Sequence, residues 1–356
     1  MKKILLAIIL LSFGFTLKAQ WVQLNSNTTE HLNAVAFTSV DTGYVVGWNG
    51  TILKTIDGGD NWIDLSLNNN WELKDVCFPA KDTGYIYATR ENNTYGSVVK
   101  MLKTIDGGNN WILQDSIIGM DSSCNDYYSG MDFLDVNTGI IAPSDNYFYF
   151  TNNGGTTWKH IRLTDICGPP QIAYTYLYDV CIYDSTHAVA VGVGNAYHVF
   201  EITDTSLIWN CIYEGQVGMS NDLRSVSFAN ENTVYATGQE GEIYKITNDD
   251  WLGRETYTID SPNHVQFNSV CFYNETLGFV GSAGIYNTTD SGINWHEQGV
   301  QNVQDIEFVD SLNGYTVGSN GSIYKTTNGG VSNFDTHRLL EEIYIYPNPF
   351  TDEVRI

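Results

Sequence analysis

Three aspartates lie at the same place in similar six-residue segments of this chain. Asp75, Asp179 and Asp305 are each third in a segment whose first, fourth and sixth residues are apolar. Two carboxylates that face each other across a cleft are the groups that hydrolyse a glycosidic bond. Lys74 and Arg224 are second in such segments, and beside aspartate they could bind a small acid or the end of a peptide. The available chemistry therefore depends on which elements bring these residues together.

The six-residue segment occurs seven times, and its apolar pattern and β-branched residues predict a strand buried on both faces. The copies are residues 32–37, 73–78, 128–133, 177–182, 223–228, 267–272 and 303–308. A turn after each copy leads into a second and a third predicted strand, and a fourth begins at a tryptophan. Four short strands in a unit of about 45 residues are typical of a β-propeller blade.

An acidic eight-residue motif, called the Asp box here, joins the third and fourth predicted strands. It occupies residues 55–62, 104–111, 151–158, 288–295 and 326–333. Repeated acids could bind calcium or transfer protons. A locked turn explains the motif better, because the acid can accept backbone N–H bonds, the glycines supply unusual backbone angles and the tryptophan packs between sheets. We predict this structural role for Asp57, Trp62, Asp106, Trp111, Asn153, Trp158, Asp290, Trp295 and Asn328.

The last unit is incomplete in the sequence, since Asn333 stands in place of the tryptophan and no fourth strand follows it. Residues 21–26, WVQLNS, have the pattern of a fourth strand with no unit before them. We therefore predict an all-β fold, a seven-bladed β-propeller of four-stranded antiparallel blades over residues 20–334. In it, the N-terminal strand closes the last blade and removes the exposed edges of an open array.

Binding is expected on the face opposite the Asp boxes, where loops join successive blades and where the repeats differ most. These loops are longest at residues 89–97, 114–127 and 164–176. Their tyrosines predict an aromatic rim for sugar or peptide, unless the loops are only packed by their own aromatics. The candidate binding residues are Tyr95, Tyr127, Tyr174 and Tyr176 on the rim, and Lys74, Asp75, Tyr178, Asp179, Arg224 and Asp305 at the channel mouth. The second group could equally be the ordinary polar lining of a solvated channel.

The first residues indicate export. Residues 1–19 have a basic start, a short apolar run and a small residue, Ala19, which is the pattern of a secretory signal peptide. No other stretch is long and apolar enough to span a bilayer. We expect a secreted or cell-surface protein, with a linker at residues 335–342.

The chain is strongly acidic, with a formal net charge of -24. Removal of the signal peptide, which contains three lysines and no acid, makes the mature chain more negative still. Such a surface repels phosphate backbones and anionic lipid, which argues against nucleic acid and membrane-surface partners. We expect a monomer.

The cysteines give no metal-site spacing, so we expect no metal and no cofactor. Cys77, Cys181 and Cys271 recur at one repeat position and are predicted to be small buried strand residues. Cys124 and Cys167 lie in predicted loops, and they form a possible disulfide because an exported protein permits one.

The Asp boxes resemble those of sialidases and other Asp-box propellers. The longer pattern of opening strand, D-T-G-Y-x-x-G, G-x-I-x-K-T and DGG-x-x-W is similar to the photosystem II stability and assembly factor family, and it extends over residues 21–334. The resemblance implies a β-propeller. Photosynthetic members are associated with a basic, arginine-bearing groove for a nascent reaction-centre subunit. This chain has only six arginines and a large negative charge, so we do not expect that activity here.

The C-terminal residues resemble a second known element. YPNPF, at residues 346–350, is followed by an alternating segment, and residues 343–356 resemble the start of the type IX secretion C-terminal sorting domain. The resemblance covers only the opening of such a domain, so we expect either a truncated chain or a broken signal; an ordinary proline-rich tail is the remaining alternative. The resemblance implies export through the type IX secretion machinery.

Two classes of function follow from the sequence. We favour a secreted or cell-surface, non-enzymatic propeller that binds protein or glycan through its loop-rich face. The alternative is an Asp-box glycoside hydrolase. An endoglucanase could use Asp75, Asp179 or Asp305, whereas a sialidase needs an arginine cluster. The candidate arginines lie in different predicted blades: Arg90, Arg162, Arg224 and Arg254.

Overall fold

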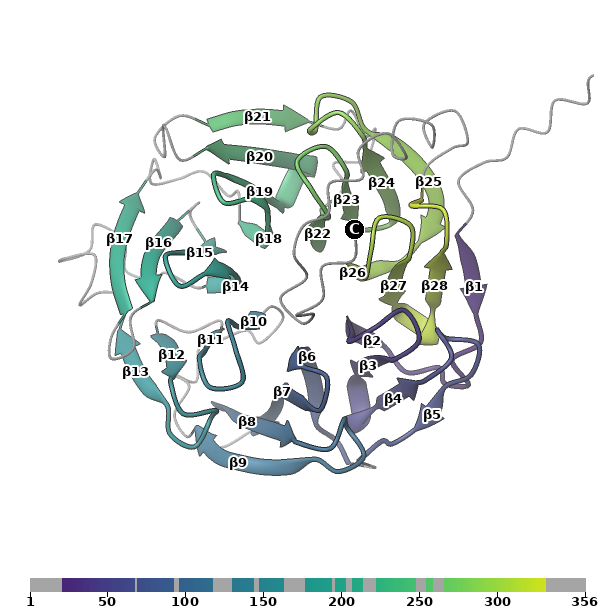
Figure 1. Ribbon diagram of the computed structural model, residues 1–356, viewed down its shortest axis with the longest axis vertical. Coiled ribbons are helices and arrows are strands. Elements are labelled where there is room, and N and C mark those ends of the chain that lie inside the picture. Colours follow the sequence, from purple (N-terminus) through teal and green to yellow (C-terminus); the bar gives the residue numbers. More distant parts are fainter. Residues whose placement is uncertain are drawn as a thin grey trace, which may run out of the picture.

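The computed structural model describes residues 21–67, 69–92, 96–117, 130–143, 147–162, 177–193, 196–202, 207–213, 222–247, 254–258 and 266–330. Their strands form four-stranded antiparallel sheets arranged in a ring (Figure 1). In six of the described sheets the strands follow one another in chain order from the centre outward, as expected where short turns join neighbouring strands; in the seventh the N-terminal strand is outermost. The predicted fold class, an all-β propeller of four-stranded antiparallel blades, is confirmed.

The described strands make up seven sheets. Blade 1 contains β2 (Leu32–Phe37), β3 (Gly43–Gly47), β4 (Ile52–Thr55) and β5 (Ile63–Asp64). Blade 2 contains β6 (Glu72–Ala80), β7 (Thr83–Asn92), β8 (Gly96–Thr104) and β9 (Ile112–Ile117). Blade 3 contains β10 (Gly130–Phe133), β11 (Gly139–Ala142), β12 (Tyr147–Thr151) and β13 (Lys159–Arg162). Blade 4 contains β14 (Leu177–Asp184), β15 (His187–Gly192), β16 (Ala196–Ile202) and β17 (Leu207–Tyr213).

The remaining sheets follow the same order around the ring. Blade 5 contains β18 (Leu223–Asn230), β19 (Thr233–Gly238), β20 (Glu242–Thr247) and β21 (Arg254–Thr258). Blade 6 contains β22 (Ser269–Phe272), β23 (Gly278–Gly281), β24 (Gly284–Thr288) and β25 (His296–Gln301). Blade 7 contains β26 (Val303–Phe308), β27 (Gly314–Gly318), β28 (Ile323–Thr326) and the N-terminal β1 (Val22–Leu24). Short 3-10 turns lie between the second and third strands of blades 1, 5 and 7: η1 (Trp48–Gly50), η3 (Gln239–Gly241) and η5 (Ser319–Gly321).

Strand β1 pairs with β28, with Val22 opposite Lys325. The preceding residue, Trp21, meets Phe308 edge-on at 6.0 Å between ring centroids. Trp62 meets Phe37 in the same way at 6.5 Å. Trp21 therefore has the same packing in blade 7 that an Asp-box tryptophan has in blade 1.

The apolar core lies between neighbouring blades. A tyrosine on the second strand of one blade stacks on a phenylalanine of the next blade's innermost strand, as Tyr44 does on Phe78 at 3.9 Å between centroids. The Tyr44 hydroxyl then donates to the Gly107 carbonyl oxygen at 2.7 Å, inside the second Asp box. Each such tyrosine combines apolar burial with a satisfied hydroxyl, so adjacent blades are held at both the core and the turn.

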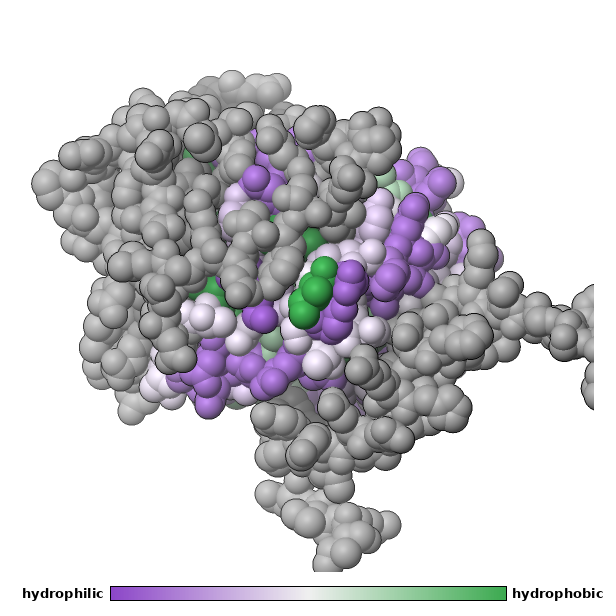
Figure 2. Space-filling view, turned by 90° about the horizontal axis from the view of Figure 1, so that it is seen from above, coloured by the Kyte–Doolittle hydropathy of each residue, from purple (hydrophilic) through white to green (hydrophobic). Residues whose placement is uncertain are grey.

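Seen edge-on, the described part of the surface is mostly hydrophilic, with few hydrophobic residues in view (Figure 2). No helix in the described part of the chain is long and apolar enough to cross a membrane.

Candidate functional site

The innermost strands carry an irregularity that places polar side chains at the channel mouth. In β6 the pairing register shifts between Leu73 and Asp75, so Lys74 is the extra residue of a β-bulge. The same shift flanks Tyr178 in β14 and Arg224 in β18. A bulge re-aims the side chains beside it. The second and third residues of these segments consequently line one pocket instead of alternating between channel and core.

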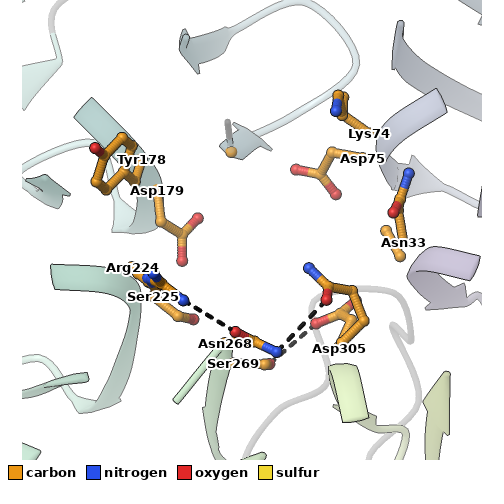
Figure 3. A pocket seen from close by; sticks show the side chains of 13 residues that line it. Asn33, Lys74, Asp75, Tyr178, Asp179, Arg224, Ser225, Asn268, Ser269 and Asp305 are labelled. Atoms are coloured by element: carbon orange, nitrogen blue, oxygen red, sulfur yellow. Dashed lines mark hydrogen bonds between the residues drawn. The ribbon is translucent and has the colours of Figure 1, made fainter. Parts of the chain in front are cut away.

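That pocket collects residues from several blades (Figure 3). Six of the predicted binding residues line it: Lys74, Asp75, Tyr178, Asp179, Arg224 and Asp305. Its other lining residues are Asn33, Ala34, Gly130, Ser225, Asn268, Ser269 and Gln304. Tyr95, Tyr127, Tyr174, Tyr176, Cys124 and Cys167 lie outside the described residues. The structure thus brings the channel-mouth candidates together, and their role in binding stays a prediction.

The aspartates of the pocket connect neighbouring blades. Asp179 accepts a hydrogen bond from the Val180 N–H at 2.8 Å and, with its other oxygen, one from the Val226 N–H of the next blade at 2.9 Å. Asp75 makes the same pair of bonds with Val76 and Met131, both at 2.7 Å. Both oxygens of each carboxylate are therefore occupied by backbone donors. We call this arrangement an interblade latch.

Asp305 makes the latch between blades 7 and 1, accepting from Ile306 at 2.8 Å and from Val35 at 3.0 Å. In blade 5 a serine takes the same place, since Ser225 Oγ accepts from the Val270 N–H at 3.1 Å. The requirement is thus a short hydrogen-bond acceptor rather than an acid. Ala34, the third residue in blade 1, has no side-chain acceptor.

A second row of latches lies two residues further along the innermost strands, and the sequence interpretation missed it. Asp132 accepts from the Ile182 N–H of the next blade at 2.7 Å, and Ser227 accepts from Phe272 at 2.9 Å. The recurrent cysteines Cys77, Cys181 and Cys271 occupy this row; they lie in strands, as predicted, and their side chains are partly rather than fully buried. The signal was the recurrence of Asp, Cys, Ser or Glu at the fifth place of every segment except the first, which has Ala36.

Burial makes these carboxyl groups unusually basic. It raises the pKa of Asp179 to about 7, and that of Asp305 and Asp132 to about 6. The pKa of Asp75 is raised well above its ordinary value, first by burial and then by the charges of Asp305 and Asp179. Burial and the charge of Asp305 also raise the pKa of Glu307. At pH 7 these carboxyl groups are therefore protonated to a greater extent than exposed ones, and the channel carries less negative charge than its number of acids suggests.

The cations at the mouth already have partners. Lys74 Nζ lies 2.5 Å from a Glu72 carboxylate oxygen. Arg224 Nη1 donates to Asn268 Oδ1 at 3.4 Å, and Asn268 Nδ2 donates to the Val303 carbonyl oxygen at 3.1 Å. The rim is consequently a connected polar network. Within the described ranges, no group of His, Cys, Asp and Glu residues has the arrangement of a metal site.

The Asp-box acids lie in a different environment. Asp57 Oδ1 accepts from the Asn61 N–H at 2.9 Å and from the Thr55 hydroxyl, also at 2.9 Å. Gly58 and Gly59 have positive φ angles of 68° and 90°, which a side chain would strain. These acids bond inside their own turns: the equivalent turns are centred on Asp106, Asn153, Asp290 and Asn328.

Comparisons with known proteins agree on the architecture. Residues 15–87 match the family described as photosynthesis system II assembly factor YCF48. No curated protein matches the chain. A solved structure of YCF48 bound to D1 peptide is 20% identical, with a TM-score of 0.64 over 87% of this chain and 94% of that one. YCF48 from Cyanidioschyzon merolae is also 20% identical, with a TM-score of 0.63 over 86% and 98%.

A solved structure with a quite different name has a similar fold. The structure of U3-55K is 11% identical, with a TM-score of 0.65 over 86% of this chain and 98% of that one. Such likeness reports the fold alone. The predicted sorting domain, at residues 343–356, lies outside the described residues. Sequence and fold together support a photosystem II assembly factor-like β-propeller.

Proposed function

We propose that this protein is a non-enzymatic propeller that binds a segment of a partner protein at the mouth of its channel. The observation that carries the proposal is the convergence of Lys74, Asp75, Tyr178, Asp179, Arg224 and Asp305 in one pocket. A rigid ring with a concave, polar mouth suits recognition of a short segment, because little ordering of the protein is needed on binding.

Binding fits the pocket better than hydrolysis does. Glycoside hydrolysis needs one carboxyl group to donate a proton and another to attack or to activate water. In this pocket both carboxylate oxygens of Asp75 and of Asp179 accept hydrogen bonds from backbone N–H groups. Releasing either oxygen for catalysis would leave a backbone donor unpaired at a blade interface.

A protein ligand is supported by the similarity to YCF48, which was solved with D1 peptide bound. That peptide belongs to YCF48 and is not assigned to this chain. A glycan ligand has less support, because Tyr178 is the one aromatic residue among those that line the pocket, and stacking on aromatic rings is the usual way to hold a sugar.

We also propose that the protein acts outside the cell or on its surface. The support is the signal-peptide pattern at residues 1–19 and the resemblance of residues 343–356 to a type IX sorting domain. Fractionation of the native host, with antibody detection, tests this part separately. Protein retained in the cytoplasm would contradict it.

The binding proposal is tested with the purified mature chain on a peptide array and a glycan array. We expect a set of peptides to bind and no glycan to bind. The double variant Tyr178→Ala/Gln304→Ala alters the rim without removing a latch aspartate, and it should lose the peptide signal. Ile105→Ala, in an Asp-box turn on the opposite face, is the matched control. Binding of glycans alone, or an unchanged signal in the double variant, would contradict the proposal.

A further inference from the structure

Trp48 is an exposed aromatic residue beside the pocket. It begins η1 (Trp48–Gly50), on the face that carries the channel mouth, and 45% of its surface is accessible to solvent. The corresponding turns of blades 5 and 7 begin with Gln239 and Ser319. A large aromatic side chain left exposed where blades 5 and 7 have a polar residue indicates a contact with something outside the chain.

His31 supports Trp48 from below. Their rings lie 4.9 Å apart at an interplanar angle of 38°, and the Trp48 N–H donates to the His31 carbonyl oxygen at 2.9 Å. Burial, followed by the positive charge of Lys74, lowers the pKa of His31, so the imidazole is neutral at pH 7. Together the two rings form an uncharged aromatic shelf with one open face.

The shelf lies next to the pocket because its residues are close to pocket residues in the sequence. His31 is two residues before Asn33, which lines the pocket. Asn33 Nδ2 donates to the Leu73 carbonyl oxygen of blade 2 at 2.8 Å, and the Gly50 N–H donates to the Trp71 carbonyl oxygen at 2.7 Å. A peptide that crosses from the shelf to the mouth would therefore meet blade 1 and blade 2 in turn.

The charges around this path are mainly negative. Glu30 lies at the foot of the shelf, where one oxygen accepts from Asn49 Nδ2 at 2.8 Å. Asp305, whose pKa of about 6 leaves it mostly ionised at pH 7, lines the pocket. The cations of the pocket, Lys74 and Arg224, already have partners in Glu72 and Asn268. A positively charged ligand group would thus gain attraction here, while a negative one would be repelled.

The chain already uses the corresponding contact on the neighbouring blade. Lys100 Nζ lies 4.3 Å from the ring centroid of Trp71, and the Arg90 guanidinium carbon lies 5.6 Å from it. Among the described residues, no cation of the chain lies over Trp48. The internal pair shows the geometry that an external cation would adopt on the open ring.

We propose that Trp48 and His31 form a shelf on which an arginine or lysine side chain of the partner segment stacks, beside the pocket at the channel mouth. This inference rests on the proposed peptide-binding function and specifies its ligand: a basic segment. The indole face supplies the cation–π contact, and Glu30 and Asp305 supply the complementary charge.

The test uses two short fluorescein-labelled glycine–serine peptides, one with two arginines and one with two glutamates, and the full mature chain. Binding is measured by fluorescence anisotropy. We expect the arginine peptide to bind and the glutamate peptide not to bind. Trp48→Ala should weaken the affinity for the arginine peptide about fivefold, which corresponds to the energy of an exposed cation–π contact. Trp48→Phe, which keeps an aromatic face, should recover most of the loss, and Ile105→Ala should have no effect.

The results separate this inference from the proposed function. Suppose that array peptides bind the protein, that the pocket variant no longer binds them, and that Trp48→Ala binds them unchanged. The proposed function at the pocket then stands, and the proposal of the shelf is wrong. Equal binding of the arginine and glutamate peptides would also overturn the shelf. Failure of every peptide on the array would overturn the proposed function itself. Circular dichroism of Trp48→Ala confirms folding, which the exposure of this side chain leads us to expect.

Discussion

The chain contains two sets of repeated acids, one in the Asp boxes and one in the channel. Their pKa values move in opposite directions, although both sets accept hydrogen bonds from the backbone. Hydrogen bonds within its own turn hold the pKa of Asp106 down, to about 2. Burial raises the pKa of Asp179 to about 7. Both nevertheless accept backbone N–H bonds, Asp106 from Asn110 and Asp179 from the next blade. The comparison teaches that an acid repeated along the chain indicates backbone N–H groups that need an acceptor in every repeat. Whether the acid is exposed or buried then decides in which direction its pKa moves.

The largest expected effect concerns the apolar residue of the Asp box rather than its acid. Trp62 is 7% exposed and packs edge-on against Phe37. Trp62→Ala should lower the free energy of unfolding by about 3 kcal/mol or more, the cost of deleting a large buried side chain. Urea denaturation followed by circular dichroism measures it. A loss below about 1 kcal/mol would mean that this turn is not packed between blades.

The next effect tests the latch. Asp179→Ala leaves the N–H groups of Val180 and Val226 without their acceptor, so the free energy of unfolding should fall by about 2 kcal/mol. Asp179→Ser places in blade 4 the residue that blade 5 uses at Ser225, and it should recover much of that loss. Equal stability of the two variants would show that the acceptor is unimportant. The same urea experiment measures both.

The third effect is a pH dependence with opposite signs in the two sets. The channel acids have folded pKa values above the value of about 4 for an unfolded aspartate, so the folded state binds protons more tightly. Their contribution to stability is present in acid and is lost as pH rises through about 6 to 7. For Asp106, with a lowered pKa, stability is lost as pH falls below 4 toward 2.

We therefore expect the melting temperature to be highest near pH 4 to 5 and to decline toward pH 8, as measured by differential scanning fluorimetry. Asp179→Asn should flatten the decline between about pH 4 and pH 7, because it removes one of the raised pKa values. A melting temperature that rises steadily from pH 5 to pH 8 would contradict the assignment of raised pKa values to the channel.

The smallest effect belongs to an exposed Asp-box acid. Asp57→Ala removes the acceptor for the Asn61 N–H and for the Thr55 hydroxyl, but water can reach this turn. The melting temperature should fall by less than in Asp179→Ala. Asp57→Asn keeps one acceptor oxygen, as Asn153 does in the third box, and should be nearly neutral. A fall equal to that of Asp179→Ala would remove the contrast between the two sets.

Much of the fold could be predicted because it depends on local patterns. The period of the opening strands and the tryptophans that follow each turn fix the order of strands within a blade. The latch between Asp179 and Val226 could not be predicted, because it joins residues 47 positions apart through the relative placement of two sheets. Cys77 shows the same limit, since its repeat position indicated a strand but not its contact with Asp132 of the next blade.

The site was predictable to the extent that it follows from the bulged segments. Lys74, Tyr178 and Arg224 could be placed at the mouth because the extra residue recurs at one place in the repeat. Trp48 was missed because the candidate binding loops were chosen by their length. The turn that contains Trp48 has an ordinary length and differs only in its residue. Comparison of the turn beginning at Trp48 with those beginning at Gln239 and Ser319 would have found it.

The absence of a side-chain acceptor at Ala34 has a consequence for how the ring opens. Ala36, at the fifth place of the same strand, also has none, so both rows of latches from blade 1 to blade 2 lack their side chain. The ring is thus fastened unevenly around its circumference. Amide hydrogen exchange should be faster along the edge between these two blades than along the edge closed by Asp179. That edge lies beside the turn that begins at Trp48, so a segment bound on the shelf would brace the ring where the latch side chains are missing.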